Sequence, residues 1–245
     1  MSLNEMSLFD VVKKQVQFKV NSYNGIFLSL IILQIFGLFV ASLGESSMSE
    51  PGYGRAVSTT YYGNGFLIGV TAMWVFISVL LMTTKAYKED DFTFISTRWS
   101  RLLSNMSFTV ILAALGTVTT YLLTHVLKVY LVFNDEKIIE VNTFSFFDLL
   151  TSLFLLFLFL FFLGLFGYTV GSIFQRNKVA AFLVSALFIF IGSITIEANG
   201  EYVNSLIYFF SKETSVLLLV IKFGIVNSLL FFVTWMVTNN EEVRV

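Results

Sequence analysis

The sequence has 245 residues, of which 56% are hydrophobic and 13% are charged, and its mean hydropathy is +0.82. Soluble domains carry about 25% charged residues, so the composition excludes an ordinary soluble domain and indicates one transmembrane domain, 1–245. The net charge of −1 is too balanced to indicate nucleic acid binding, and the absence of cysteine excludes disulfides and thiolate metal sites.

The first patterned segment, 7–21, is predicted to form an amphipathic helix. Ser7 followed by Asp10 resembles a capping box. Apolar residues recur at every fourth position, at Leu8, Val12, Val16 and Val20. Polar residues occupy the other side, at Lys13, Lys14, Gln17 and Asn21. We expect this N-terminal amphipathic helix to lie in the inner membrane interface with its lysines toward anionic headgroups. The alternative is a helical extension of the first span.

Six apolar stretches are long enough to cross a membrane, because a helix needs about 20 such residues to span the hydrocarbon core. They are expected at about 24–43, 65–84, 106–127, 147–173, 179–197 and 216–237. With both termini in the cytoplasm, ten Lys and Arg residues lie on the cytoplasmic side and four outside. We therefore predict an all-α, multi-pass protein of the plasma membrane, of a bacterial cell, with six transmembrane helices and cytoplasmic N- and C-termini.

The connection 85–105, between the second and third spans, has the pattern of a short helix beside the membrane. Asp90 and Asp91 suit the N-terminal end of such a helix, whereas Arg98 and Arg101 suit its C-terminal end. Its apolar stripe consists of Phe92, Ile95, Trp99 and Leu102. Aromatic residues and Arg are enriched at the centres of interfaces, so the segment is a candidate docking surface. The alternative is simple anchoring at the lipid interface by Trp99.

A second short helix is predicted over 201–211, between the fifth and sixth spans. Gly200 separates this segment from the fifth span, and the polar stretch 211–214 interrupts the apolar run after it. Residues from Tyr202 to Phe210 supply an apolar helical face. We expect a re-entrant or interfacial helix on the outer side. The alternative is that these residues begin the sixth span.

Two polar side chains in or near the spans are candidates for function. Lys222 is the one charge that lies inside a predicted span rather than at its end, and intramembrane charges are costly and often functional. It lies close enough to the span's end to extend its ammonium group outward instead. His125 is the single histidine, and without cysteine it makes a metal site improbable. We interpret it as a polar residue at the interface.

Two pairs of glycines have the spacing that lets membrane helices approach closely. They are Gly65 with Gly69 and Gly167 with Gly171. We interpret both pairs as packing positions, with pairing between subunits as a further possibility. No G-x-x-x-x-G-K-[ST] loop, catalytic triad or intramembrane pair of carboxylates is found, so the chain is not expected to be an enzyme, and no catalytic, cofactor or metal site is predicted in it.

The order of these features resembles the permease subunits of ABC transporters of the type-2 exporter class, over essentially the whole chain. The stretch from Phe94 to Arg101 is similar to the family's small residues followed by Arg in this connection. Of the family's Glu…Gly-Thr…Leu-Pro pattern, Glu89 and Asp90 are present, whereas the Gly and Pro are not. The resemblance implies a second permease, identical or related, and a separate cytoplasmic ATPase that holds ATP and Mg.

The resemblance also implies where the ATPase docks. The coupling helix would present Asp91, Phe92, Phe94, Ile95, Arg98, Trp99, Arg101 and Leu102. The apolar interior suits a hydrophobic or amphipathic cargo, such as a peptide, a lipid or a drug.

Two other functions remain open from the residues alone. A stand-alone channel or ion-coupled carrier needs polar side chains along a path through the membrane. The spans contain few such residues beyond Gln34, Ser78, Thr117, Thr119 and Thr120. A non-transporting accessory or immunity protein is the third hypothesis, and no sequence feature excludes it.

Overall fold

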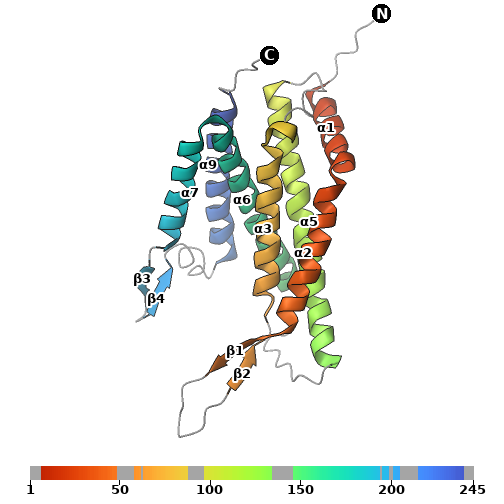
Figure 1. Ribbon diagram of the computed structural model, residues 1–245, viewed down its shortest axis with the longest axis vertical. Helices are drawn as coiled ribbons and strands as arrows, with labels where there is room; N and C mark the ends of the chain where they lie inside the picture. Colours follow the sequence, from red (N-terminus) through yellow and green to blue (C-terminus); the bar gives the residue numbers. More distant parts are fainter. Residues whose placement is uncertain are drawn as a thin grey trace, which may run out of the picture.

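The computed structural model describes residues 7–48, 58–61, 63–87, 97–133, 146–193, 195–198, 201–204 and 215–239. The chain folds into a bundle of helices (Figure 1). The helices are α1 (Leu8–Ser22), α2 (Asn24–Ser42), α3 (Gly65–Met82), α5 (Arg98–Phe133), α6 (Phe146–Arg176), α7 (Lys178–Ser193) and α9 (Val216–Asn239). The predicted helical class is confirmed.

Two small β-hairpins, which the sequence analysis did not predict, extend from this bundle. β1 (Glu45–Met48) pairs with β2 (Ser58–Tyr61), and β3 (Thr195–Ala198) pairs with β4 (Glu201–Asn204), both antiparallel. The first hairpin lies between α2 and α3 in the chain, and the second lies between α7 and α9.

Within the described part of the chain, five helices are long and apolar enough to cross a membrane: α2, α3, α5, α6 and α9. The chain is therefore a multi-pass membrane protein by the length and composition of its helices. The remaining candidate, α7, has 16 residues and a length of about 24 Å, against about 30 Å for the hydrocarbon core. The helix ends earlier than the predicted span 179–197, because Thr195 and Ile196 belong to β3.

The helix α6 is the centre of the bundle and packs against α3, α5, α7 and α9. The helix α2 packs against α3 and α5, and α1 packs against the N-terminal half of α5. In Figure 1, α1 and the C-terminal end of α9 lie at one end of the bundle, and the two hairpins point away from that end.

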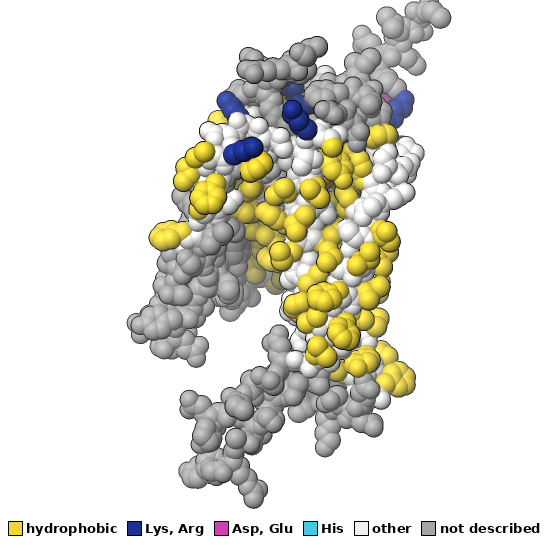
Figure 2. Space-filling view, in the orientation of Figure 1, with side chains coloured by type: hydrophobic (Ala, Val, Ile, Leu, Met, Phe, Trp, Pro, Cys, Tyr) yellow, Lys and Arg dark blue, Asp and Glu magenta, His cyan; other side chains and the backbone are white. Residues whose placement is uncertain are grey.

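We call the end that contains α1 the Lys/Arg-rich end. Figure 2 shows Lys and Arg gathered toward it on the visible face, with apolar side chains below. From the positions of their elements, the described basic residues of this end are Lys13, Lys14, Lys19, Lys85, Arg98, Arg101, Arg176 and Lys178. A basic cluster beside an apolar surface is the distribution expected where a helical bundle leaves a membrane.

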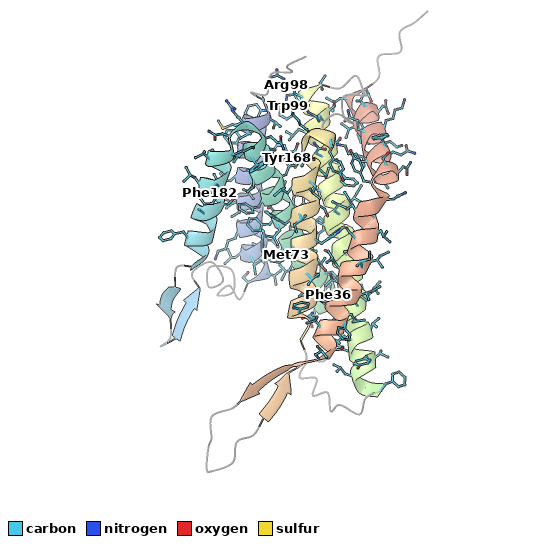
Figure 3. All side chains as sticks on the ribbon, in the orientation of Figure 1. Phe36, Met73, Arg98, Trp99, Tyr168 and Phe182 are labelled. Atoms are coloured by element: carbon cyan, nitrogen blue, oxygen red, sulfur yellow. The ribbon has the colours of Figure 1, made fainter. Side chains whose placement is uncertain are left out.

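The apolar core lies where α3, α5 and α6 meet, and Phe108, Leu112 and Leu160 are fully buried there. Many large apolar side chains point away from the bundle instead. Phe182 on α7 is 73% exposed, Met73 on α3 is 65% exposed and Phe36 on α2 is 55% exposed (Figure 3). An apolar outer surface of this kind suits contact with hydrocarbon.

Glycines allow α6 to lie directly against α3. A Cβ atom added at Gly167 would lie 2.6 Å from the backbone oxygen of Phe76, and one added at Gly171 would overlap Thr83. The packing interpretation of this pair is thus confirmed within one chain. A Cβ atom added at Gly65 or Gly69 would meet no atom within 4 Å in the described structure.

The amphipathic segment forms a helix of its own, with Tyr23 between it and α2. Ser7 caps it, because the Asp10 backbone N–H donates to Ser7 Oγ at 3.2 Å. The face that packs against the protein carries Gln15 and Lys19, both 1% exposed, whereas the valine stripe is only half-buried. The location of α1 in the membrane interface stays a prediction.

Two other predicted helices need correction. Glu201–Asn204 form β4, so the helix predicted over 201–211 is wrong for these residues, and 205–211 lie outside the described residues. The reason is hairpin chemistry: Asn199-Gly200 separates two segments that contain β-branched and aromatic residues. In the connection 85–105, residues 98–105 are the first two turns of the long helix α5 and not part of a short helix. Residues 85–87 are helical, and 88–96 lie outside the described residues, so a short helix there stays a prediction.

Candidate functional site

The candidate site lies at the Lys/Arg-rich end, where the first turns of α5 meet the last turns of α9. Of the predicted docking residues, Arg98, Trp99, Arg101 and Leu102 are described, and they belong to α5. Asp91, Phe92, Phe94 and Ile95 lie outside the described residues. The described part of the docking segment therefore begins at Arg98, the first residue of α5.

The four described docking residues do not share one exposed face. Arg98 is exposed and Trp99 is 47% exposed, whereas Arg101 is 9% and Leu102 is 3% exposed. Arg101 and Leu102 therefore hold α5 in the bundle rather than present a surface to a partner. Figure 3 shows Arg98 and Trp99 together at this end.

Trp99 contacts α9, a helix that the sequence analysis did not connect with this segment. Its indole stacks on that of Trp235, with ring centroids 5.9 Å apart and an angle of 29° between the planes. A small pocket beside the pair is lined by Arg98, Trp99, Leu102, Trp235 and Thr238. We call these five residues the tryptophan pocket. Trp235 near the end of a predicted span was the signal that could have pointed to it, because Trp is enriched at membrane interfaces.

A buried polar network lies a few residues further along α5 and joins α1, α5 and α6. Lys19 Nζ donates to Ser104 Oγ at 2.9 Å and to Asn105 Oδ1, and Asn105 Nδ2 donates to Tyr168 OH at 2.9 Å. Burying an ammonium group costs free energy unless hydrogen bonds compensate. The network therefore fixes α1 against α5 and fixes α5 against α6.

Gln15 lies one turn before Lys19 on the same face of α1. Its Nε2 and Oε1 atoms are buried and have no hydrogen-bond partner among the described residues. Sequence reasoning missed this face, because it placed the helix's lysines toward anionic headgroups and assigned no role to Gln15 or Lys19. Gln15, Lys19 and Tyr23 recur at every fourth position, and this spacing was the sequence signal for a buried face of the helix.

A second polar cluster lies between α2, α3 and α5. Gln34 Nε2 donates to Thr119 Oγ1 at 2.8 Å and to Thr71 Oγ1 at 3.3 Å, and Thr120 Oγ1 donates to Thr71 Oγ1 at 2.8 Å. Thr71 and Thr119 also donate to the backbone carbonyls of their own helices. These side chains bond to one another across three helices, so their observed role is helix packing.

The two remaining candidates lie apart from the site. Lys222 is half-buried in α9, and the 13 positions between it and Trp235 correspond to about 20 Å along the helix. His125 is exposed on α5, with Nδ1 3.0 Å from the Tyr121 backbone oxygen. Among the described residues, no group of three or more His, Cys, Asp or Glu lies together to hold a metal ion.

Searches with family models, curated proteins and solved structures found no match to this chain.

Proposed function

We propose that this chain is the membrane permease subunit of a type-2-class ABC exporter. In this proposal it forms the translocation path with a second permease, and separate cytoplasmic ATPase subunits supply the ATP and Mg site. The observation that carries the proposal is the order of elements at the Lys/Arg-rich end. The helix α1 precedes the first apolar helix, and the connection between α3 and α5 opens at the same end.

The geometry of α5 supports a route for force from an ATPase into the bundle. The ATPase would contact the connection before Arg98, through Asp91, Phe92, Phe94 and Ile95. A displacement of that connection would move the first turns of α5. Trp99 would transmit the movement to α9 through its stack on Trp235, and Asn105 would transmit it to α1 and α6. Such a movement requires contacts that differ between two states of the transporter.

The experiment that tests the docking is co-purification. The chain is isolated in mild detergent from its native membrane, and the proteins that accompany it are identified. We expect a stoichiometric ATPase with the native chain, and its loss when 91–95 is replaced by Gly and Ser. Arg176→Glu is the control, because Arg176 is an exposed basic residue at the same end that does not line the pocket.

A native preparation without an ATPase would reject the exporter proposal. The stand-alone carrier and the accessory protein would then rank above it. Retention of the ATPase after the 91–95 replacement would reject this docking site, provided that the replaced chain still inserts in the membrane.

We also propose that α7 is the sixth span and that both termini are cytoplasmic in a plasma membrane. The chain contains no cysteine, so single cysteines can report sidedness without background. In intact cells, an impermeant maleimide should label Ser215→Cys but not Ser7→Cys or Asn177→Cys. Equal labelling of the cysteines at positions 177 and 215 would mean that α7 does not cross the membrane.

A further inference from the structure

The tryptophan pocket lies between the first turns of α5 and the last turns of α9, at the Lys/Arg-rich end of two helices of membrane-spanning length. Trp235 is within the last turns of α9, a helix of membrane-spanning length, and Trp99 stacks on it from α5. Both indoles therefore lie at one level. Indoles prefer the boundary between headgroups and hydrocarbon, since they combine an apolar ring with one N–H donor. The pocket opens between two helices at this boundary.

The lining of the pocket is divided between charge and apolar surface. Arg98 supplies an exposed guanidinium, and Thr238 supplies a hydroxyl. Trp99, Leu102 and Trp235 supply the apolar part. A guanidinium has five N–H donors, so Arg98 can hold a phosphate group while it also contacts the protein. The combination matches a molecule with an anionic head and an apolar tail.

An apolar surface continues from the pocket toward the middle of the bundle along α9. Phe232 contacts Trp235 with ring centroids 5.8 Å apart, and its side chain is 50% exposed. Leu229, three residues before Phe232 on α9 and therefore nearer the middle of the bundle, is 60% exposed. An acyl chain that leaves the pocket would find this surface at hydrocarbon depth.

We propose that the tryptophan pocket is a binding site for an anionic phospholipid, whose phosphate binds Arg98 and whose acyl chain lies against Trp235 and Phe232. The site is independent of the proposed ATPase docking, which precedes Arg98 in the chain. In this proposal Arg98 binds the lipid rather than a protein partner. A basic side chain at the membrane surface favours anionic over neutral lipid by about fivefold.

The test uses the protein's own tryptophans. The chain has three, and Trp74 is 2% exposed inside the bundle, where its indole N–H donates to Ser29 Oγ at 2.9 Å. Quenching by lipids brominated on the acyl chains therefore reports chiefly on Trp99 and Trp235. The purified chain is placed in phosphatidylcholine vesicles that contain increasing fractions of brominated phosphatidylglycerol or brominated phosphatidylcholine.

We expect half-maximal quenching at an about fivefold lower fraction of the phosphatidylglycerol. Arg98→Gln should remove this preference, Arg98→Lys should retain part of it, and Arg176→Gln should leave it unchanged. Equal quenching by the two lipids in the native chain would overturn the proposal, whatever the variants do.

Equal losses in Arg98→Gln and Arg176→Gln would also overturn it, because they would indicate a general charge effect. Inorganic phosphate, compared with chloride at the same ionic strength, should leave the preference in place. Its abolition by phosphate would identify a site for a free anion instead of a lipid.

Discussion

The close contact of α6 with α3 at Gly167 predicts how much stability an alanine at this position would cost. A Cβ atom at this position would lie 2.6 Å from the Phe76 backbone oxygen and 3.3 Å from the carbonyl carbon. A carbonyl group inside a helix cannot rotate away as a flexible side chain can. Gly167→Ala must therefore push α6 from α3, and we expect it to lower the free energy of unfolding by about 1–3 kcal/mol, the cost of overpacking.

The matched control is Gly69→Ala on α3. A Cβ atom there meets no described atom within 4 Å, and alanine is favoured over glycine in a helix by up to about 1 kcal/mol. This variant should be neutral or stabilising. Both variants are unfolded with SDS from mild detergent micelles, and helix content is followed by circular dichroism. Equal unfolding midpoints for Gly167→Ala and Gly69→Ala would refute the packing argument.

Three further substitutions test the polar contacts with the same unfolding assay. Lys19→Met removes the donor of the hydrogen bond to Asn105 Oδ1 and should lower the free energy of unfolding by about 1–3 kcal/mol. Lys13→Met, at an exposed position of the same helix, should change it by less than about 0.5 kcal/mol. Similar losses in the two variants would contradict the buried network. Gln34→Leu should cost only about 1 kcal/mol, because hydrogen bonds between membrane helices average about 0.6 kcal/mol each. His125→Ala should stay within about 0.5 kcal/mol, and a larger loss would mean that its exposed ring has a structural role.

The spans could be predicted because the hydrocarbon core imposes a length and a composition on each helix. The five apolar helices, the Ser7 cap of α1 and the packing of Gly167 all follow from local rules of this kind. The start of α5 at Arg98 did not follow from them. Arg98 and Arg101 were interpreted as the end of a separate helix, yet the apolar residues that follow them continue one helix through the membrane.

The buried face of α1 could not be predicted, because it depends on a partner that is distant in sequence. Lys19 and Gln15 look like solvent-facing residues when α1 is considered alone. Ser104 and Asn105, 85 and 86 positions later in the chain, make Lys19 an internal residue. The stack of Trp99 on Trp235 is a contact of the same kind, because the two residues belong to helices that are far apart in the sequence.

The polar side chains within the bundle bear on the way a cargo could cross. Of the polar residues from which a path through a single chain could have been built, Gln34 and Thr120 bond to Thr71, and Thr119 accepts from Gln34. Thr117 and Thr119 also donate to backbone carbonyls of their own helix. A path that used them would have to break contacts that hold α2, α3 and α5 together. A route on the outer surface of the bundle, enclosed by a second copy or a related chain, would leave these contacts intact. The hydrogen bonds therefore count against a path through this polar cluster within a single chain.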